Sequence, residues 1–341
     1  MQRYEYFVKC IIFLCVCKLL LVFLQNERMP YYSPNTHIVK HIFVINPCAG
    51  KYDSTAEITQ KVETYASEHS DFDYSIYVTQ SAGDATEFVK RWCDHHVDQP
   101  VRFYACGGDG TLNEVVTGLI DYPFAEVTVV ASGSGNDYIK YYSTHEAFND
   151  IARLVEGETH KVDVMKVNDR YSINVCNFGF DAMVCKIGND VRRKPIIGGK
   201  HSYTTGIIKS IFTSRTNYVR MSVDGEPFFD GNMLLTTLSN GRFNGGCYMC
   251  APLSKNDDGL LEVNLFKPMS LIKFASLIDD YSKGTHINRP EVKRLMKYRQ
   301  GATVEIASND PFWLVIDGEM MHSNHYRVEN LKHAVTFVSP K

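Results

Sequence analysis

The sequence has no excess of charge of either sign. Its 36 Lys and Arg residues nearly balance 39 Asp and Glu residues, and the formal net charge at pH 7 is -3. Binding to DNA or RNA depends on a strongly basic surface, so nucleic acid is not an expected partner. Internal repeats and low-complexity linkers are also absent. The 341 residues, 44% of them hydrophobic, are therefore enough for a real core in one large domain or two.

The ten cysteines are too dispersed for a disulfide scaffold. Most lie inside apolar runs, which predicts reduced, buried thiols of a cytosolic protein. Cys247 and Cys250 form a single C-x-x-C pair. Because a structural zinc site needs two further ligands, this pair does not predict a metal site.

Residues 6–25 are the one apolar stretch that is about long enough to span a bilayer, although Lys9 and Lys18 interrupt it. A membrane anchor is one interpretation. A signal peptide is disfavoured because no small-residue cleavage site follows. An extension upstream of a start at Met29 fits best, because the folded pattern begins only near Ile38. Residues 1–28 are therefore set apart from the folded domains.

Strand and helix patterns alternate in the first half of the chain. Apolar runs at 37–46, 73–79, 101–107 and 126–131 predict strands, and amphipathic runs at 54–69, 84–97 and 112–121 predict helices. This alternation indicates a parallel, doubly wound α/β domain over 38–160. From residue 161 to 341, short alternating runs separated by Gly, Asn and Asp predict a mostly antiparallel β domain, with helices only at 182–215 and 269–299.

Known phosphate-binding motifs are missing. Lys51 follows Gly50, but Tyr52 stands where a Walker A loop has Ser or Thr, and no glycine lies five residues before Gly50. The catalytic loop of protein kinases and the dinucleotide fingerprint after the first strand are absent as well.

Four loops at predicted strand ends nevertheless have the residues of a phosphate site. They are 46–51, 79–85, 107–111 and 133–137, and two of them are rich in glycine. Ligands of an open α/β sheet bind beyond the carboxyl ends of its strands, where glycine lets backbone N–H groups approach a phosphate. Each loop alone is an ordinary turn, but the four together predict a nucleotide site.

Asp109 stands inside the Gly107-Gly108-Asp109-Gly110-Thr111 loop, where a carboxylate would repel a phosphate. A divalent cation between the two, or a role in proton transfer, removes this conflict, and phosphoryl transfer needs both functions. Asp137, Asp317 and Glu319 are the candidate acidic partners.

These motifs, in this order, resemble the bacterial soluble diacylglycerol kinase family, which includes sphingosine and ceramide kinases. The resemblance extends over about residues 38–341 and rests on Gly-Gly-Asp-Gly-Thr with Asn113-Glu114, Asn46-Pro47 with Gly50, Gly133–Asp137 and Asp317-Gly318-Glu319. Ser134 replaces the usual Thr and keeps the hydroxyl. The family implies an ATP- and Mg²⁺-dependent kinase that phosphorylates diacylglycerol or a similar membrane lipid alcohol, with the lipid pocket in the β domain.

The resemblance also implies the site residues. Glu319 would accept the proton, with Asp317 beside it and Asp109 as a third catalytic acid. The residues expected to bind ATP are Asn46, Pro47, Gly50, Thr79, Gly107, Gly108, Gly110, Thr111, Asn113, Ser134, Asn136 and Asp137. The loop 254–263 resembles the structural Mg²⁺ loop of the family, with Asp258 giving a carboxylate and Lys255 and Leu260 giving carbonyls. Taken without the resemblance, this loop is a hairpin turn.

Residues 191–223 contain seven basic residues and no acidic residue, and isoleucines are interleaved among them. Such a stretch suits peripheral contact with an anionic leaflet at the inner membrane face, with a solvated helix as the alternative. The oligomeric state is open, and a homodimer is compatible with the sequence.

Two other functions compete with a lipid kinase. An NAD kinase-like phosphotransferase shares the Gly-Gly-Asp-Gly loop, but 133–137 and the acidic 317–319 segment favour the lipid kinase. A non-catalytic nucleotide- or lipid-binding regulator would not need Asp109, Asp137 and Glu319 together.

Overall fold

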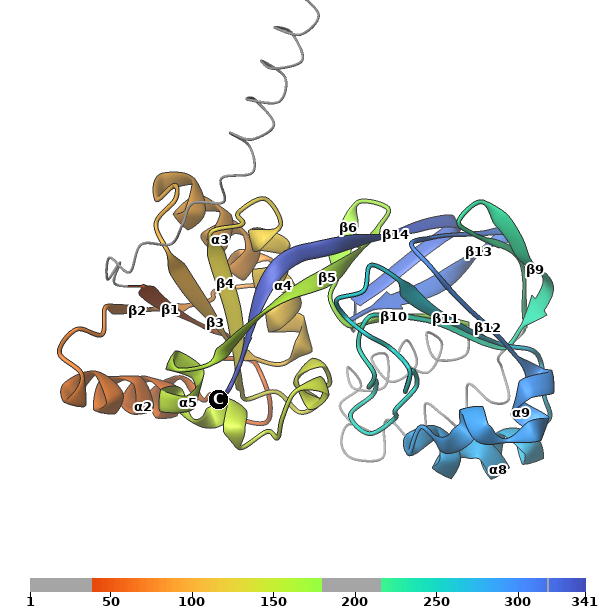
Figure 1. Ribbon diagram of the computed structural model, residues 1–341, viewed down its shortest axis with the longest axis horizontal. Coiled ribbons are helices and arrows are strands. Elements are labelled where there is room, and N and C mark those ends of the chain that lie inside the picture. The colour runs from red at the N-terminus through yellow and green to blue at the C-terminus, as the bar shows by residue number, and fades with distance from the viewer. Residues whose placement is uncertain (1–38, 180–215, 318) are drawn as a thin grey trace, which may run out of the picture. The chain divides into compact units, whose positions relative to one another are not determined.

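The computed structural model describes residues 39–179, 216–317 and 319–341, and these belong to one compact unit, Val39–Lys341. Its first half alternates strands and helices (Figure 1). The elements are β1 (Lys40–Ile45), α2 (Thr55–Glu68), β2 (Tyr74–Val78), α3 (Asp84–His95), β3 (Val101–Gly107), α4 (Asp109–Leu119), β4 (Ala125–Ala131) and α5 (Ile151–Val155), with short 3₁₀ turns η1 (Tyr138–Tyr141) and η2 (Ala147–Asn149).

The first four strands are parallel, in the order β2-β1-β3-β4. Every residue of β3 is buried, which explains why its sequence is a continuous apolar run and not an alternating one. Helix α4 begins at Asp109 and not at 112 as the apolar spacing predicts. The glycine loop thus runs directly into the first turn of the helix, which hydrophobic periodicity alone does not reveal.

The second half is mostly antiparallel. It contains β5 (Glu158–Val167), β6 (Arg170–Ser172), β7 (Val175–Gly179), β8 (Asn217–Val223), β9 (Glu226–Met233), β10 (Leu235–Ser239), β11 (Leu261–Phe266), β12 (Met296–Gly301), β13 (Thr303–Ile316) and β14 (Glu319–Ser339). The order β12-β11-β10-β7-β13-β14 is antiparallel throughout. A parallel α/β part followed by this β part confirms the predicted fold class.

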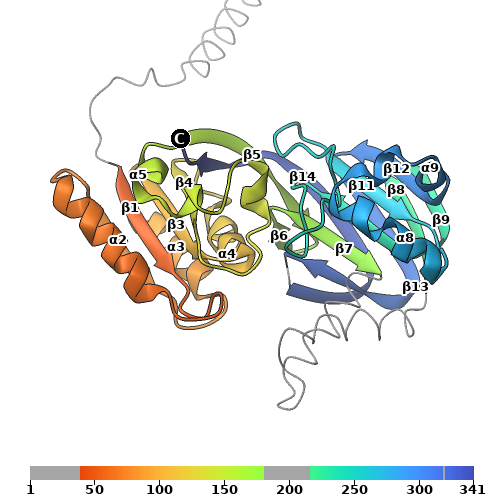
Figure 2. The ribbon, with the colours of Figure 1, turned by 90° about the horizontal axis from the view of Figure 1, so that it is seen from below.

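Strands β5 and β14 connect the two halves (Figures 1 and 2). Most of β14 pairs with β13 or β5, and its end pairs in parallel with β4 through Thr336 and Phe337. The buried Phe337 packs against Tyr138 and Tyr142 of the first half. The boundary proposed at 160/161 therefore falls within β5, and the C-terminal residues belong to the first core.

Three short elements precede β12: α8 (Leu271–Ser282), η3 (Thr285–Asn288) and α9 (Pro290–Leu295). They lie in the predicted helical region 269–299. Residues 6–25, and 191–215 of the basic stretch, lie outside the described residues. Among the helices that the structure describes, none combines the length and apolar character needed to cross a membrane.

Candidate active site

The loops that are predicted to bind phosphate meet at one edge of the parallel sheet. Strands β1, β3 and β4 are neighbours, so the loops that follow Ile45, Gly107 and Ala131 lie side by side. The Asn46 amide Nδ2 donates a hydrogen bond to the Thr111 hydroxyl at 3.0 Å, which ties the first loop to the second. The Asn136 amide Nδ2 donates to the Gly107 carbonyl at 2.9 Å, which ties the third loop to the second.

Close backbone contact requires glycine in these loops. A Cβ atom on Gly133 would overlap the backbone of Gly108, and one on Gly50 would overlap the Ser132 carbonyl. Gly50 also has a φ of +75°, which an L side chain rarely adopts. The glycines therefore let three loops converge around the N-terminus of α4.

A cavity of about 630 Å³ opens beside these loops and is lined by both halves of the protein. Nine of the fifteen predicted catalytic and nucleotide-binding residues line it. They are Asn46, Gly50, Gly108, Asp109, Gly110, Thr111, Ser134, Asp137 and Asp317. A neighbouring cavity of about 240 Å³ is lined by Pro47 and Thr79 and shares Asn46 and Thr111 with the first.

Three predicted nucleotide-binding residues line neither cavity. Gly107 is the buried last residue of β3, and its carbonyl accepts backbone N–H groups of Ser132 and Gly133. Asn136 is buried, with a φ of +46°, and bonds to Gly107 as described above. The buried Oδ1 atom of Asn113 has no hydrogen-bond partner within the described residues. Gly107 and Asn136 therefore support the loops from behind.

Asp109 and Asp317 approach the cavity from opposite halves. Asp109 Oδ1 accepts the backbone N–H of Tyr138 at 3.1 Å. Burial, and secondarily the negative charge of Asp137, raise the Asp109 pKa above its ordinary value. Burial, and to a smaller extent the negative charge of Asp109, raise the Asp317 pKa to about 7, against the opposing effect of hydrogen bonds from the backbone N–H groups of Val175 and Ile173. The cavity thus contains two electrostatically coupled carboxyl groups, and both have raised pKa values.

Glu319 lies outside this cavity. Its side chain is 58% exposed, and its Oε2 atom is 3.1 Å from the Arg170 guanidinium. Asp317 adopts a φ of +44°, so the chain turns between the two acidic residues. The sequence places them two positions apart, but the turn brings only Asp317 into the cavity.

Asp137 has a partner that the sequence does not reveal. Lys140 Nζ lies 2.6 Å from Asp137 Oδ1 and also donates to the Gly246 carbonyl at 2.6 Å. The Gly246 N–H donates back to Asp137 at 2.9 Å. Asp137 and Lys140 therefore bind both the N–H and the carbonyl of Gly246, a residue of the second half that lines the cavity. We call Asp137, Lys140 and Gly246 the interlobe clasp.

The predicted Mg²⁺ loop is a tight turn. Asp258 Oδ1 accepts the backbone N–H of Leu260 at 2.9 Å, and Lys332 Nζ lies 3.4 Å from the Asp258 carbonyl. The fully buried Asp163 accepts the next N–H, from Gly259, at 2.7 Å. These contacts are those of a hairpin turn, and the role of Lys255, Asp258 and Leu260 as ligands stays a prediction. In the described ranges, three or more His, Cys, Asp or Glu side chains never gather closely enough to hold a metal ion by themselves.

Sequence reasoning missed the wall that the second half contributes to the cavity. Its members are Asn174, Val175, Asn177, Asn244, Gly245, Gly246 and Val315. The Gly245-Gly246 pair is a local signal of a turn in the sequence, and both residues have positive φ angles in the structure. Asn177 and Val315 belong to strands whose register decides which face they share.

Two family models match successive parts of the chain. The diacylglycerol kinase catalytic domain matches residues 40–167, and the YegS C-terminal NAD kinase beta sandwich-like domain matches residues 174–339. A diacylglycerol kinase of Staphylococcus carnosus is 29% identical over 304 residues, which cover 87% of this chain and 94% of that protein. One from Staphylococcus epidermidis is 28% identical over 303 residues, which cover 87% of this chain and 91% of that protein.

A crystal structure of a diacylglycerol kinase from Bacillus anthracis str. Sterne has the same fold, with a TM-score of 0.64, 21% identity, and coverage of 88% of this chain and 96% of that one. A catalytic α/β domain joined to a β sandwich around an acidic, glycine-lined cavity defines a kinase of the NAD kinase-like fold. Along 87% of its length the chain is similar to diacylglycerol kinases, and its two halves match a diacylglycerol kinase catalytic domain and a YegS-type C-terminal domain in succession.

Proposed function

We propose that this protein is an ATP- and Mg²⁺-dependent lipid kinase that phosphorylates the hydroxyl group of diacylglycerol or a similar lipid alcohol. The observation that carries this proposal is the cavity in which glycine loops suited to phosphate face two coupled carboxyl groups, Asp109 and Asp317. Phosphoryl transfer from ATP to an alcohol needs both features in one place.

The glycine loops would bind the phosphates of ATP. Gly108 precedes α4, an 11-residue helix whose first N–H groups and dipole favour an anion. Thr111 and Ser134 line the same cavity and add hydroxyl donors. Pro47 and Thr79 line the adjoining cavity, which supports a place there for the nucleoside.

The acidic groups fit a magnesium ion that is shared with the substrate. A Cβ atom on Gly135 would lie 3.2 Å from Asp109 Oδ2 and 3.7 Å from Asp137 Oδ2, so two carboxylates border one small space. Mg²⁺ typically binds one or two carboxylates and completes its shell with substrate phosphates and water. Asp109 would hold the ion, which supplies positive charge against the transferred phosphoryl group.

Asp317 is the proposed proton acceptor, in place of Glu319. It lines the cavity, and its pKa of about 7 suits a group that takes a proton from an alcohol near neutral pH. Glu319, exposed and paired with Arg170, would instead border the entrance.

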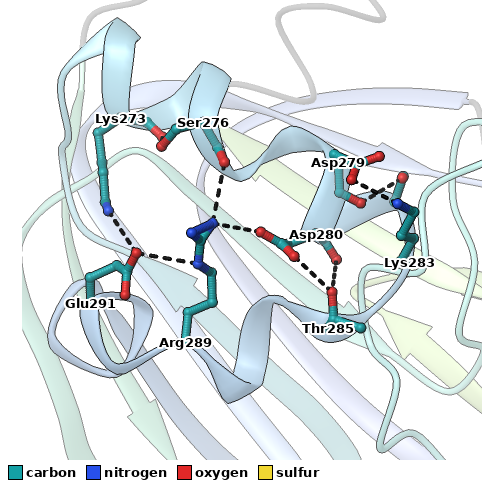
Figure 3. Close-up of polar contacts among 9 residues, drawn as sticks. Lys273, Ser276, Asp279, Asp280, Lys283, Thr285, Arg289 and Glu291 are labelled. Carbon is teal, nitrogen blue, oxygen red and sulfur yellow. Dashed lines mark hydrogen bonds and ion pairs between the residues drawn. The ribbon is translucent and has the colours of Figure 1, made fainter.

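The acyl chains need an apolar site, and a second cavity offers one. Most of its lining is apolar, including Phe266, Phe274, Leu277 and Val292, and His286 also lines it. At about 40 Å³ it is too small for a whole chain, so α8 must move to admit one. Outer-face contacts tie α8 to η3 and α9: Arg289 binds Asp280 at 2.6 Å, and Lys273 binds Glu291 at 3.1 Å (Figure 3). We therefore expect these elements to move together.

A lipid alcohol stays in the bilayer, because exposing each CH₂ group to water costs about 0.8 kcal/mol. Peripheral binding to the inner, anionic membrane face through 191–223 remains part of the proposal.

Transfer of radiolabelled phosphate from ATP tests the function. The acceptor panel is diacylglycerol, monoacylglycerol, ceramide, sphingosine, phosphatidylglycerol and NAD. Labelling of a lipid alcohol supports the proposal, whereas labelling of NAD alone would identify an NAD kinase. Absence of any labelled product would favour a regulator.

A further inference from the structure

One wall of the main cavity is a strand face that contains a polar side chain, Asn177, with no role in the proposed phosphoryl transfer. Along β7, Cys176 and Phe178 point into the apolar core, while the alternate residues Val175 and Asn177 line the cavity. On the neighbouring β13, Val315 stands directly opposite Asn177 and lines the same cavity. Asn177 therefore places a polar amide beside the apolar side chains of Val175 and Val315 on this wall.

The orientation of the Asn177 amide is fixed from behind. Its Oδ1 atom accepts a hydrogen bond from the Thr237 hydroxyl at 3.1 Å, and Thr237 is fully buried on β10. Asn177 itself is only 3% exposed. Because Oδ1 is engaged by Thr237, the Nδ2 group is the part of the amide left to interact with a molecule in the cavity. A hydrogen bond from this amide to a ligand oxygen contributes about 0.5–1.5 kcal/mol, so an acceptor at this point is favourable.

Strand geometry places Asn177 and the proposed proton acceptor about one small polar head group apart. Val315 opposes Asn177, and Asp317 follows two residues later on the cavity side. Alternate residues of a strand are about 7 Å apart, so a hydroxyl at Asp317 leaves the next few atoms of the same molecule beside Asn177.

We propose that Asn177 is a specificity-determining residue that donates a hydrogen bond to an acceptor oxygen close to the reacting hydroxyl, namely the ester carbonyl of a diacylglycerol. This inference rests on the proposed lipid kinase function. Thr237 is a positioning residue that holds the amide for this contact.

The test compares an ester substrate with one that lacks the carbonyl. Steady-state kinetics are measured for wild type and Asn177→Leu on diacylglycerol and on the matching dialkylglycerol ether. Loss of one neutral hydrogen bond predicts a five- to tenfold lower kcat/KM for the ester, through KM, and at most about a twofold change for the ether and for the KM of ATP. Thr237→Val should give a smaller loss with the same ester selectivity.

Asn264→Leu is the matched control. Asn264 is also 3% exposed, stands opposite Thr237 on β11 in the same row of residues, and does not line the cavity. It should leave the ester-to-ether ratio unchanged. Asn177→Asp keeps the side-chain shape while removing the donor, and it should lose the ester preference if the leucine variant does not fold.

An unchanged ester-to-ether ratio in both Asn177 variants would overturn the inference while leaving the kinase function intact. An unchanged ratio that comes with equal losses on both substrates would indicate a structural role for Asn177. Wild-type protein that labels no lipid would remove the proposed function, and the inference with it.

Discussion

Replacing Asp317 with Asn is expected to remove a large part of the pH dependence of the free energy of unfolding. Burial raises the pKa of this carboxyl group from 3.8 to about 7 in the folded protein. Below pH 4 the group is protonated in both states. Between pH 4 and 7 the unfolded chain loses the proton and the folded protein keeps it, so rising pH destabilises the folded protein.

The size of this effect follows from the two pKa values. Each pH unit in the window costs about 1.4 kcal/mol, so the full loss is at most about 4 kcal/mol and is complete above pH 7. The amide of Asn cannot ionise and avoids this loss. The variant also loses an acceptor for the N–H of Ile173 or Val175, which costs about 1–3 kcal/mol at every pH.

Urea denaturation followed by circular dichroism, with chelator present, measures the difference between variant and wild type from pH 4 to 8. The variant should gain up to about 4 kcal/mol relative to wild type as the pH rises across this range. Glu319→Gln, at the exposed acid of the same turn, is the control. A difference between Asp317→Asn and wild type that stays constant over the range would refute the buried, proton-holding role of Asp317.

The remaining predictions concern other parts of the protein. Lys140→Met leaves the Asp137 carboxylate without its cation, so the free energy of unfolding should fall by about 1–3 kcal/mol and the KM for ATP should rise. Lys140→Arg keeps the charge and is the control. Wild-type values of both quantities in Lys140→Met would contradict the role of the interlobe clasp. Leu277→Trp should fill the apolar cavity and raise the KM for long-chain lipids but not for ATP, and an unchanged lipid KM would exclude this cavity as the acyl site. Asp258→Ala should lower the melting temperature and abolish its dependence on added Mg²⁺. Identical melting curves of the wild type with and without chelator would show that 254–263 is a turn that binds no Mg²⁺. Reversal of the basic residues 192–194 to Glu should weaken binding to anionic vesicles at low salt without changing ATP affinity, and unaltered vesicle binding would make this stretch a solvated face.

The sequence predicted the fold because local patterns are strong in it. Buried parallel strands read as continuous apolar runs, and glycine loops mark their carboxyl ends. The same patterns brought Asn46, Asp109 and Ser134 into one candidate site. These residues lie on adjacent strand ends, so the topology of a parallel sheet fixes their proximity once the strands are identified.

The rest depended on contacts that no local pattern encodes. Nothing in the sequence distinguishes Lys140 from a surface lysine. It is part of the interlobe clasp because its ammonium group binds the carbonyl of Gly246 in the second half. Asn177 faces the cavity because of the pairing of β7 with β10 and β13, and a shift of one residue would turn it into the core. Asp317 and Glu319 differ in position because of a left-handed residue at the turn.

The most direct test of the account is phosphate transfer by wild type and Asp109→Asn under identical conditions. Wild type should transfer the γ-phosphate of ATP to diacylglycerol or a related lipid alcohol in the presence of Mg²⁺. Asp109→Asn should keep its circular dichroism spectrum and lose at least about a hundredfold in kcat, the scale expected for a charge-positioning group at the reacting centre. Equal lipid phosphorylation by both proteins, or none by wild type, would contradict the assignment of this cavity as the active site of a lipid kinase.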